Sequence, residues 1–182
     1  GMWLTEPPVA KVYRRRENDG EPVNDRRLRA RIASGEIRRI APGSYVRAAT
    51  WKALTPVARH AQLVWEAAAR MAPGQTLSDF AAASLYGIDI LGQWPDVIDV
   101  MIPLASGGRS SGAIRRHARA LGDDESVEWG RHRITTPLRT TVDLIASLRF
   151  MEAVAAADQA LWLRRDDGAL VDADVVVVGT RF

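Results

Sequence analysis

The chain has 182 residues, of which 47% are hydrophobic and 26% are charged. This is the composition of a globular protein and excludes a disordered tail or a fibre, and no apolar run approaches the roughly 20 residues of a membrane span. The sequence contains no cysteine. Disulfide scaffolds, thiolate zinc sites, iron–sulfur clusters and cysteine nucleophiles are therefore excluded.

Charge is distributed unevenly along the chain. Arginine accounts for 23 of the 25 basic residues, and the formal net charge is +3. Residues 1–60 hold 13 basic and 6 acidic residues, a net charge of +7, whereas the remainder carries −4. A basic segment joined to a mildly acidic one indicates a polyanion-binding module on a scaffold.

The first residues contain no secretory signal. Residues 2–12 include two prolines and lack the apolar region of a signal peptide. We therefore expect a cytoplasmic protein.

A short basic helix is predicted next, over residues 25–34. Asn24 is a favourable N-cap, Asp25 suits the positive end of the helix dipole, and Gly35 is a typical stop. At 100° per residue, Leu28 and Ile32 share one face of this helix. The arginines spread over the rest of its surface, and they are Arg26, Arg27 and Arg29.

A basic hairpin follows the helix. The runs EIRRIA (36–41) and SYVR (44–47) flank the turn dipeptide Pro42-Gly43. A helix followed by a hairpin is the second half of a winged helix-turn-helix, in which the helix enters the DNA major groove and the hairpin contacts the backbone. We expect such a module over residues 1–52.

Arginine suits this role because it neutralises phosphates, releasing counterions, and can bind guanine edges with two hydrogen bonds. The candidate groove contacts are Arg26, Arg27 and Arg29. The candidate wing contacts are Arg38, Arg39 and Arg47. Arg14, Arg15 and Arg16 are candidates for an additional arm.

The remaining residues, 53–182, predict an α+β body with a short antiparallel sheet and flanking helices. Four helices are expected. The first begins at Pro56 after the cap Thr55 and ends before Gly74, and the second runs from the cap Ser78 to Gly87. The other two cover 137–148 and 150–164. The expected strands are 97–103 and 113–118, joined by a hairpin loop at 105–112, and a pair within 126–134 turned at Gly130.

Catalytic motifs are missing from the sequence. Neither lysine lies two residues after an acidic residue, so the common metal-nuclease element is absent, and no G-x-S-x-G element supports a serine nucleophile. His117 and His132 could be neighbours on strands, yet two imidazoles without a third ligand make a poor zinc site. We predict no enzymatic activity, no metal and no cofactor.

Two polar features of the body are interpreted as structural. His60 lies beside the apolar stripe of its predicted helix, four residues before Val64, which favours a partly buried position. Arg139 and Asp143 are one helical turn apart and can pair.

Four blocks, in order, resemble the AbiEi-type antitoxin family of bacterial transcriptional regulators, chiefly its actinobacterial members. They are RRLRARIASGEIRRIAPGSYV (26–46), LSDFAAASLYGI (77–88), VIDVMIPLASGGRSSGAIRRH (97–117) and ITTPLRTTVDLI (134–145). The resemblance implies an N-terminal winged helix on an α+β body, binding to operator DNA, and autorepression of a type IV toxin–antitoxin operon. It also implies a nucleotidyltransferase-like toxin that the antitoxin opposes without a tight complex.

The sequence departs from the family pattern in three places. Relatives have a helix pair before the recognition helix, whereas the stretch 14–22 is polar and interrupted by glycine and proline, so we expect a degenerate first half of the winged helix. Relatives carry leucine at the position of Arg31, and many continue into an endonuclease-like domain for which this sequence has no room. The alternative hypothesis is a protein-interaction module whose reduced winged helix no longer reads DNA. The operator, the toxin and the oligomeric state stay open.

Overall fold

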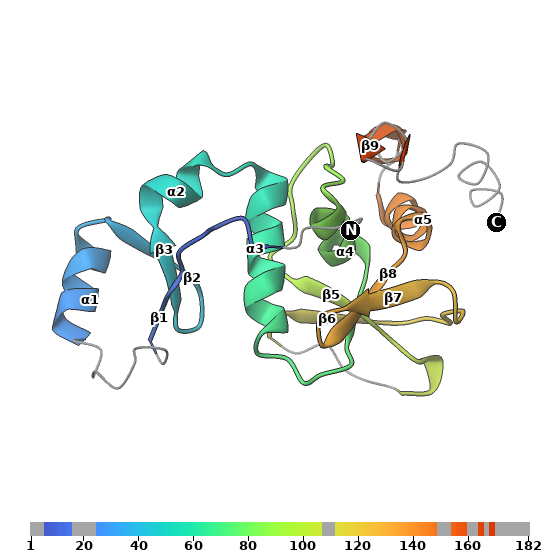
Figure 1. Cartoon of the computed structure of the whole chain (residues 1–182), viewed down its shortest axis with the longest axis horizontal. Helices are drawn as coiled ribbons and strands as arrows, with labels where there is room; N and C mark the ends of the chain where they lie inside the picture. Colours follow the sequence, from blue (N-terminus) through green and yellow to red (C-terminus); the bar gives the residue numbers. More distant parts are fainter. Residues whose placement is uncertain are drawn as a thin grey trace.

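The structure, a computed structural model, describes residues 6–15, 25–106, 112–148, 154–159, 164–165 and 168–169. The molecule is elongated, with a small lobe at one end, a larger body at the other and one long helix between them (Figure 1). We call residues 6–15 and 25–53 the basic lobe and residues 76–148 the body. Helices and strands both contribute substantially, which confirms the α+β class.

The basic lobe contains a three-stranded antiparallel sheet and two short helices. Its elements are β1 (Tyr13–Arg14), α1 (Asp25–Ala33), β2 (Ile37–Ala41), β3 (Ser44–Arg47) and α2 (Ala48–Ala53). The strand order is β1-β3-β2, and Val9, Val46 and Trp51 form a small core. The predicted helix and hairpin are confirmed, whereas β1 and α2 were not predicted.

Helix α1 ends as its sequence indicates. Gly35 has a φ of 74°, the N–H of Glu36 donates to Arg31 O and the N–H of Gly35 donates to Ile32 O, both at 3.0 Å. This is a Schellman motif, in which a left-handed glycine satisfies the last carbonyls. The proposed cap Asn24 lies outside the described residues.

The predicted apolar face of α1 is not covered by a core. No residue of α1 is buried, and Ile32 is 38% exposed. The helix therefore projects from the end of the molecule (Figure 1), and the first residue of the adjoining strand, Ile37, is buried. Of the described residues before the hairpin, only 25–33 are helical, and most of the stretch 14–22, for which a degenerate first half was predicted, lies outside the described residues.

Helix α3 (Pro56–Ala68) connects the lobe to the body. It begins as predicted, because the Thr55 hydroxyl accepts a hydrogen bond from the N–H of Ala58 at 3.3 Å. It ends at Ala68, well before Gly74. Val64 and Ala68 belong to the core of the body.

A buried carboxylate on α3 ties the lobe to this helix. Glu66 is 1% exposed and accepts hydrogen bonds from Arg14 of β1 at 2.8 Å and from the hydroxyl of Ser44 of β3 at 2.7 Å. Gln62 donates to Glu66 at 3.3 Å and accepts from the N–H of Val9 at 2.9 Å. We call Arg14, Ser44, Gln62, Glu66 and Arg70 the Glu66 junction.

The body is a five-stranded sheet packed against helices. Its elements are β4 (Thr76–Leu77), α4 (Asp79–Tyr86), β5 (Ile98–Ile102), the 3-10 helix η1 (Leu104–Ser106), β6 (Ile114–Ala118), β7 (Ser126–Trp129), β8 (His132–Thr135) and α5 (Pro137–Ser147). The strand order is β6-β5-β4-β8-β7. Helix α4 packs between α3 and α5 and against β5.

Strand pairing in this sheet is mixed. The pairs β4–β5 and β7–β8 are antiparallel, and the turn at Gly130 is as predicted. The predicted hairpin of 97–103 with 113–118 is wrong, because β5 and β6 are parallel. The nearly continuous burial of β5 is typical of a parallel strand.

The other helix boundaries were predicted well. Gly87 ends α4 in the left-handed conformation, and Thr136 caps α5 by accepting from the N–H of Arg139. Ser78 occupies the cap position of α4, but its side chain makes no cap hydrogen bond.

Two short strands and a helical segment are described beyond α5. Of the predicted helix 150–164, residues 154–159 are helical, whereas Arg164 lies in β9 (Arg164–Arg165), which pairs with β10 (Gly168–Ala169). The rest of that prediction lies outside the described residues. Among the helices that the structure describes, none is both long and apolar enough to cross a membrane.

Candidate nucleic-acid interface

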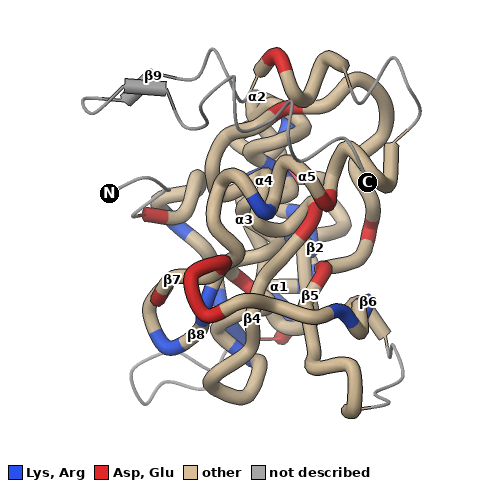
Figure 2. Tube along the Cα trace, turned by 90° about the vertical axis from the view of Figure 1, so that its right-hand side faces the viewer, with Lys and Arg blue, Asp and Glu red and all other residues tan. Residues whose placement is uncertain are grey.

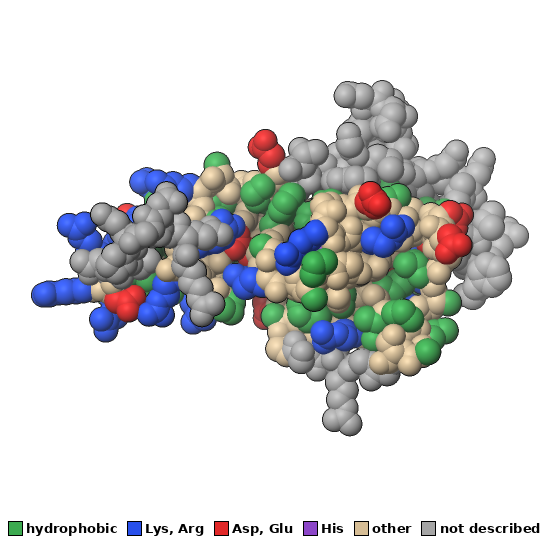
Figure 3. Space-filling view, turned by 60° about the horizontal axis from the view of Figure 1, so that its bottom comes forward, with side chains coloured by type: hydrophobic (Ala, Val, Ile, Leu, Met, Phe, Trp, Pro, Cys, Tyr) green, Lys and Arg blue, Asp and Glu red, His purple; other side chains and the backbone are tan. Residues whose placement is uncertain are grey.

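The six arginines predicted to contact DNA are all exposed on the basic lobe. They are Arg26, Arg27, Arg29, Arg38, Arg39 and Arg47. Basic side chains gather over the end of the molecule that this lobe forms (Figure 3). Acidic residues are more frequent on the body, where they include the turn before β7 (Figure 2). The charge asymmetry of the sequence is therefore also an asymmetry in space.

Helix α1 presents three of these arginines. The Nε–H of Arg29 donates to the carbonyl oxygen of Asp25 at 3.1 Å, which holds this side chain along the helix. Asp25 also pairs with Arg15 at 2.9 Å, so Arg15 lies beside the start of α1. No residue of α1 is buried, so its side chains are exposed or half-buried.

The wing arginines divide between the two faces of the sheet. In the β2–β3 register Arg39 lies opposite Tyr45 and Arg47 opposite Ile37, whereas Arg38 lies opposite Val46. Since side chains alternate along a strand, Arg39 and Arg47 share one face and Arg38 lies on the other. Arg38 stacks over the Trp51 ring, with 5.8 Å to the ring centroid.

Tyr13 of β1 lies at the centre of a cationic cluster. The guanidinium of Arg31 lies over its ring at 4.6 Å and the ammonium of Lys11 at 5.3 Å. A hydrogen bond from Arg47, and to a lesser extent one from Arg31, lowers the pKa of the Tyr13 phenol. The hydrogen bond between Arg47 and Tyr13 also raises the pKa of Arg47. Arg31 is thus held by the Tyr13 ring and by Glu36, with 2.7 Å between the guanidinium and the Glu36 carboxylate.

A groove of about 620 Å³ runs beside β2, the free edge strand of this sheet. Its cationic lining is Arg38, Arg39, Lys52 and Arg59, and Ile32 and Trp51 supply apolar surface. The sequence reasoning missed Lys52 and Arg59 because they belong to α2 and α3. Arg59 also donates to the carbonyl oxygens of Trp51 and Lys52 at 3.0 and 2.9 Å, so it fixes the end of α2.

The predicted N-terminal arm is not formed by Arg14. That side chain bonds to buried Glu66 at 2.8 Å and belongs to the Glu66 junction. A buried carboxylate is a stronger partner for an arginine than water is, which explains why Arg14 turns inward. Arg15 is exposed, and Arg16 lies outside the described residues.

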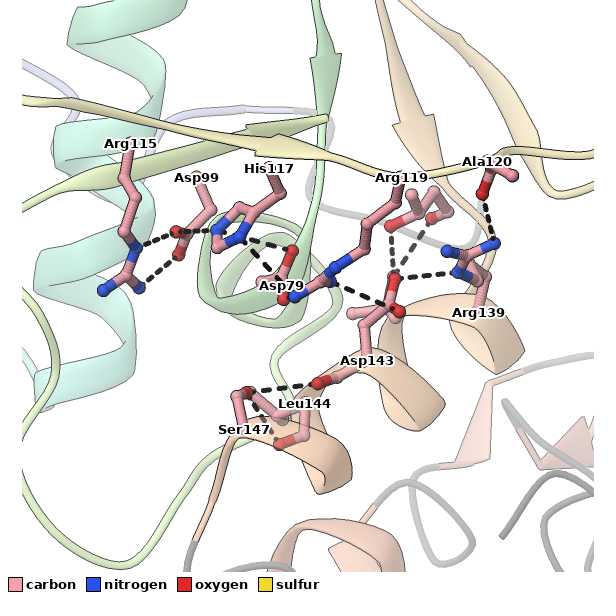
Figure 4. Close-up of polar contacts among 12 residues, drawn as sticks. Asp79, Asp99, Arg115, His117, Arg119, Ala120, Arg139, Asp143, Leu144 and Ser147 are labelled. Carbon is pink, nitrogen blue, oxygen red and sulfur yellow. Dashed lines mark hydrogen bonds and ion pairs between the residues drawn. The ribbon is translucent and has the colours of Figure 1, made fainter. Parts of the chain in front are cut away.

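A second polar group lies in the body, across β5, β6, α4 and α5 (Figure 4). We call it the polar ladder, and its members are Asp79, Asp99, Arg115, His117, Arg119, Arg139 and Asp143. Asp99 accepts from Arg115 at 2.6 Å and lies 2.7 Å from the Nε2 atom of His117. The ladder continues from Arg119 to Asp79 at 2.9 Å.

The members of the ladder on α5 are the pair predicted from sequence, Arg139 and Asp143. Arg139 donates to Asp143 at 2.8 Å and to Glu125 at 2.7 Å, which confirms that Arg139 and Asp143 pair. Burial raises the pKa of Asp143 although Arg139 opposes this shift. Each carboxylate of the ladder pairs with at least one cation, so the group links β5, β6, α4 and α5.

Asp79 is the one strained member of the ladder. Its φ of 47° is left-handed, and its Oδ2 atom is buried without a hydrogen-bond partner among the described residues. Its other oxygen is held by Arg119. The strain therefore accompanies an ion pair between the start of α4 and the end of β6.

The histidines do not form a site. His117 and His132, which the sequence allowed to be neighbours, are not, because β5 and β4 separate their strands and His132 bonds to the carbonyl oxygen of Ala68 at 2.8 Å. His60 is 1% exposed and packs on Trp94 with ring centroids 5.0 Å apart, which places it inside the body. Burial lowers the pKa of His60 to about 4.

Metal ligands do not converge in the described part of the chain, where no three His, Cys, Asp or Glu residues are placed to hold an ion. Of the predicted loop 105–112, residues 107–111 lie outside the described residues. Comparison with protein-family models and with curated proteins finds no match for this sequence.

Proposed function

We propose that this protein is a non-enzymatic, DNA-binding transcriptional regulator of the antitoxin type, acting in the cytoplasm on its own operator. The observation that carries the proposal is the position of the six exposed arginines on one projecting helix and the adjoining hairpin. In a winged helix these two elements meet the major groove and the backbone. The toxin that it opposes is expected to be nucleotidyltransferase-like, as in the family that the sequence resembles.

The roles of the arginines follow from their elements. Arg26, Arg27 and Arg29 enter the major groove with α1. Arg39 and Arg47 contact the backbone from one face of the wing, and Arg38 does so from the groove beside β2. Lys52 extends this backbone contact along α2.

The test is fluorescence anisotropy with the DNA upstream of the gene, at several salt concentrations. Each phosphate contact contributes about −0.9 to the slope of log affinity against log salt concentration, so four to five contacts predict a slope of about −4. Arg29→Glu is expected to weaken binding about tenfold or more and to relax the preference for the upstream sequence over unrelated DNA.

A matched control has the same net charge as the Arg29→Glu variant. The double variant Gln93→Glu and Ala146→Glu adds the same negative charge at exposed positions of the body. It should bind DNA as the unmodified protein does, apart from a small long-range effect. No binding at low salt, or equal losses in both variants, would refute the proposal.

The second candidate is a protein-interaction module. It is favoured by the single helix that precedes the hairpin in the described residues, where a helix-turn-helix has a pair. Two results would support it: a nucleotidyltransferase-like protein still co-purifies with this chain after nuclease treatment, and the chain does not bind DNA.

A further inference from the structure

A second groove, of about 290 Å³, lies where the basic lobe meets the body. Its walls come from the β2–β3 turn, from α3 and from the edge of the body sheet. The apolar residues that matter are Ile40, Pro42, Leu63, Ala67, Ile98 and Ile114. We propose that this groove binds a small apolar monocarboxylate, which acts as an effector of the basic lobe.

The size and lining of the groove favour a small molecule. Its surface is mainly apolar, and Leu63, Ala67 and Ile114 are only half-buried although they border the main core. The volume is at the lower end of the range for small-molecule sites. It suits one aromatic or branched group with a short chain.

The charge of the ligand follows from the two charged residues that line the groove, Arg70 and Asp96. The side chain of Arg70 is 40% exposed, and a guanidinium binds a carboxylate with two parallel hydrogen bonds. Asp96 disfavours a second negative charge on the ligand. A single carboxylate at the Arg70 end is therefore the matching head group.

Arg70 couples the groove to the wing. It donates to the carbonyl oxygen of Pro42 and to the hydroxyl of Ser44, both at 3.1 Å, and lies 3.9 Å from Glu66. A carboxylate bound to Arg70 competes with these two acceptors. Binding then loosens the attachment of the β2–β3 turn to α3.

The first experiment measures binding without DNA. The probe is 4-phenylbutyrate, compared with 4-phenylbutylamine, which has the same apolar body and a cationic end. Calorimetry should give saturable binding of one probe per chain, with a dissociation constant on the order of 1 mM for about a dozen non-hydrogen atoms. The amine should bind at least tenfold more weakly. Equal affinity for both probes, or no binding of 4-phenylbutyrate at a concentration tenfold above this dissociation constant, overturns the proposal.

Variants locate the site. Ala67→Trp fills the groove, and Ala113→Trp does so from an exposed position that leaves the core intact. Both should lower probe affinity at least tenfold, whereas Ala69→Trp, at the exposed position directly after α3 and outside the groove, should not. Undiminished binding by a folded Ala113→Trp variant would place the probe elsewhere and overturn the proposal.

The effect on DNA rests on the proposed function and is measured separately. With saturating 4-phenylbutyrate, anisotropy should show a severalfold loss of DNA affinity, and Arg70→Gln should remove the response. Unchanged DNA affinity with bound probe would overturn the effector role. A protein that binds the probe but no DNA contradicts the proposed function and leaves the ligand site supported.

Discussion

Replacing Glu66 with glutamine tests whether a buried charge holds the basic lobe on the body. The carboxylate is 1% exposed and accepts hydrogen bonds at 2.7 and 2.8 Å from two different strands of the lobe. Glutamine has nearly the same shape, but it has one acceptor oxygen in place of two and no charge. The change therefore isolates the electrostatic contribution of the junction.

The expected magnitude follows from the partners. Breaking a buried ion pair costs about 3–5 kcal/mol, and hydrogen bonds to charged groups contribute about 1.5–3 kcal/mol each. The arginines of the junction are 35% and 40% exposed, so water partly replaces the lost partner and the lower end applies. We expect a loss of about 3 kcal/mol in the free energy of unfolding, and a Tm lower by roughly 6–12 °C for a protein of this size.

Urea denaturation followed by circular dichroism and tryptophan fluorescence measures this loss. Glu128→Gln is the control, because Glu128 is exposed on β7 and a surface substitution of this kind changes stability by less than about 0.5 kcal/mol. A loss below about 1 kcal/mol for Glu66→Gln would refute the inference that the charge holds the two parts together.

Three further predictions follow from individual residues. Because burial lowers the pKa of His60 to about 4 in the folded state, the unfolded chain binds a proton first as pH falls below about 6.5. Stability should therefore drop by about 2 kcal/mol between pH 7 and pH 5, and a folded His60→Gln variant should lose that part of the pH dependence in urea titrations. Hydrogen bonds from Arg47 and Arg31 lower the pKa of Tyr13, so absorbance titration should find a tyrosine that ionises below 10, and Arg47→Gln should raise its pKa; an unchanged titration curve would contradict the cluster. Gly35→Ala should destabilise the protein by about 1 kcal/mol, because φ is 74° there while the space for a methyl group is open. Gly35→Asn is the comparison, because asparagine adopts the left-handed conformation more readily than alanine does, and an equal loss in both variants, or no loss in either, would argue against the Schellman motif.

Local signals in the sequence determined much of the fold. Capping residues and glycines act within one or two turns of chain, so Thr55, Thr136, Gly35 and Gly87 marked helix ends correctly. The hairpin at Pro42-Gly43 and the turn at Gly130 were readable for the same reason. The end of α3 was missed because Ala69 to Met71 carry no breaker before Gly74.

Pairing direction could not be predicted in this way. The Gly/Ser stretch between β5 and β6 looks like a hairpin loop, since its composition is the same whether the chain turns back or crosses over. The very short strands β1 and β4 have no alternating pattern to detect and exist because neighbouring strands pair with them.

The sequence by itself determined that this protein has a basic first third, a capped helix and hairpin that display arginines, and no motif for catalysis. Only the tertiary structure decided which charges are available to a partner. Arg14 turns inward to Glu66, Arg38 separates from Arg39 across the sheet, and Lys52 joins the groove beside β2. The reason is physical: local rules set the backbone over a few residues, whereas the partner of a charged side chain depends on which distant segments are packed beside it.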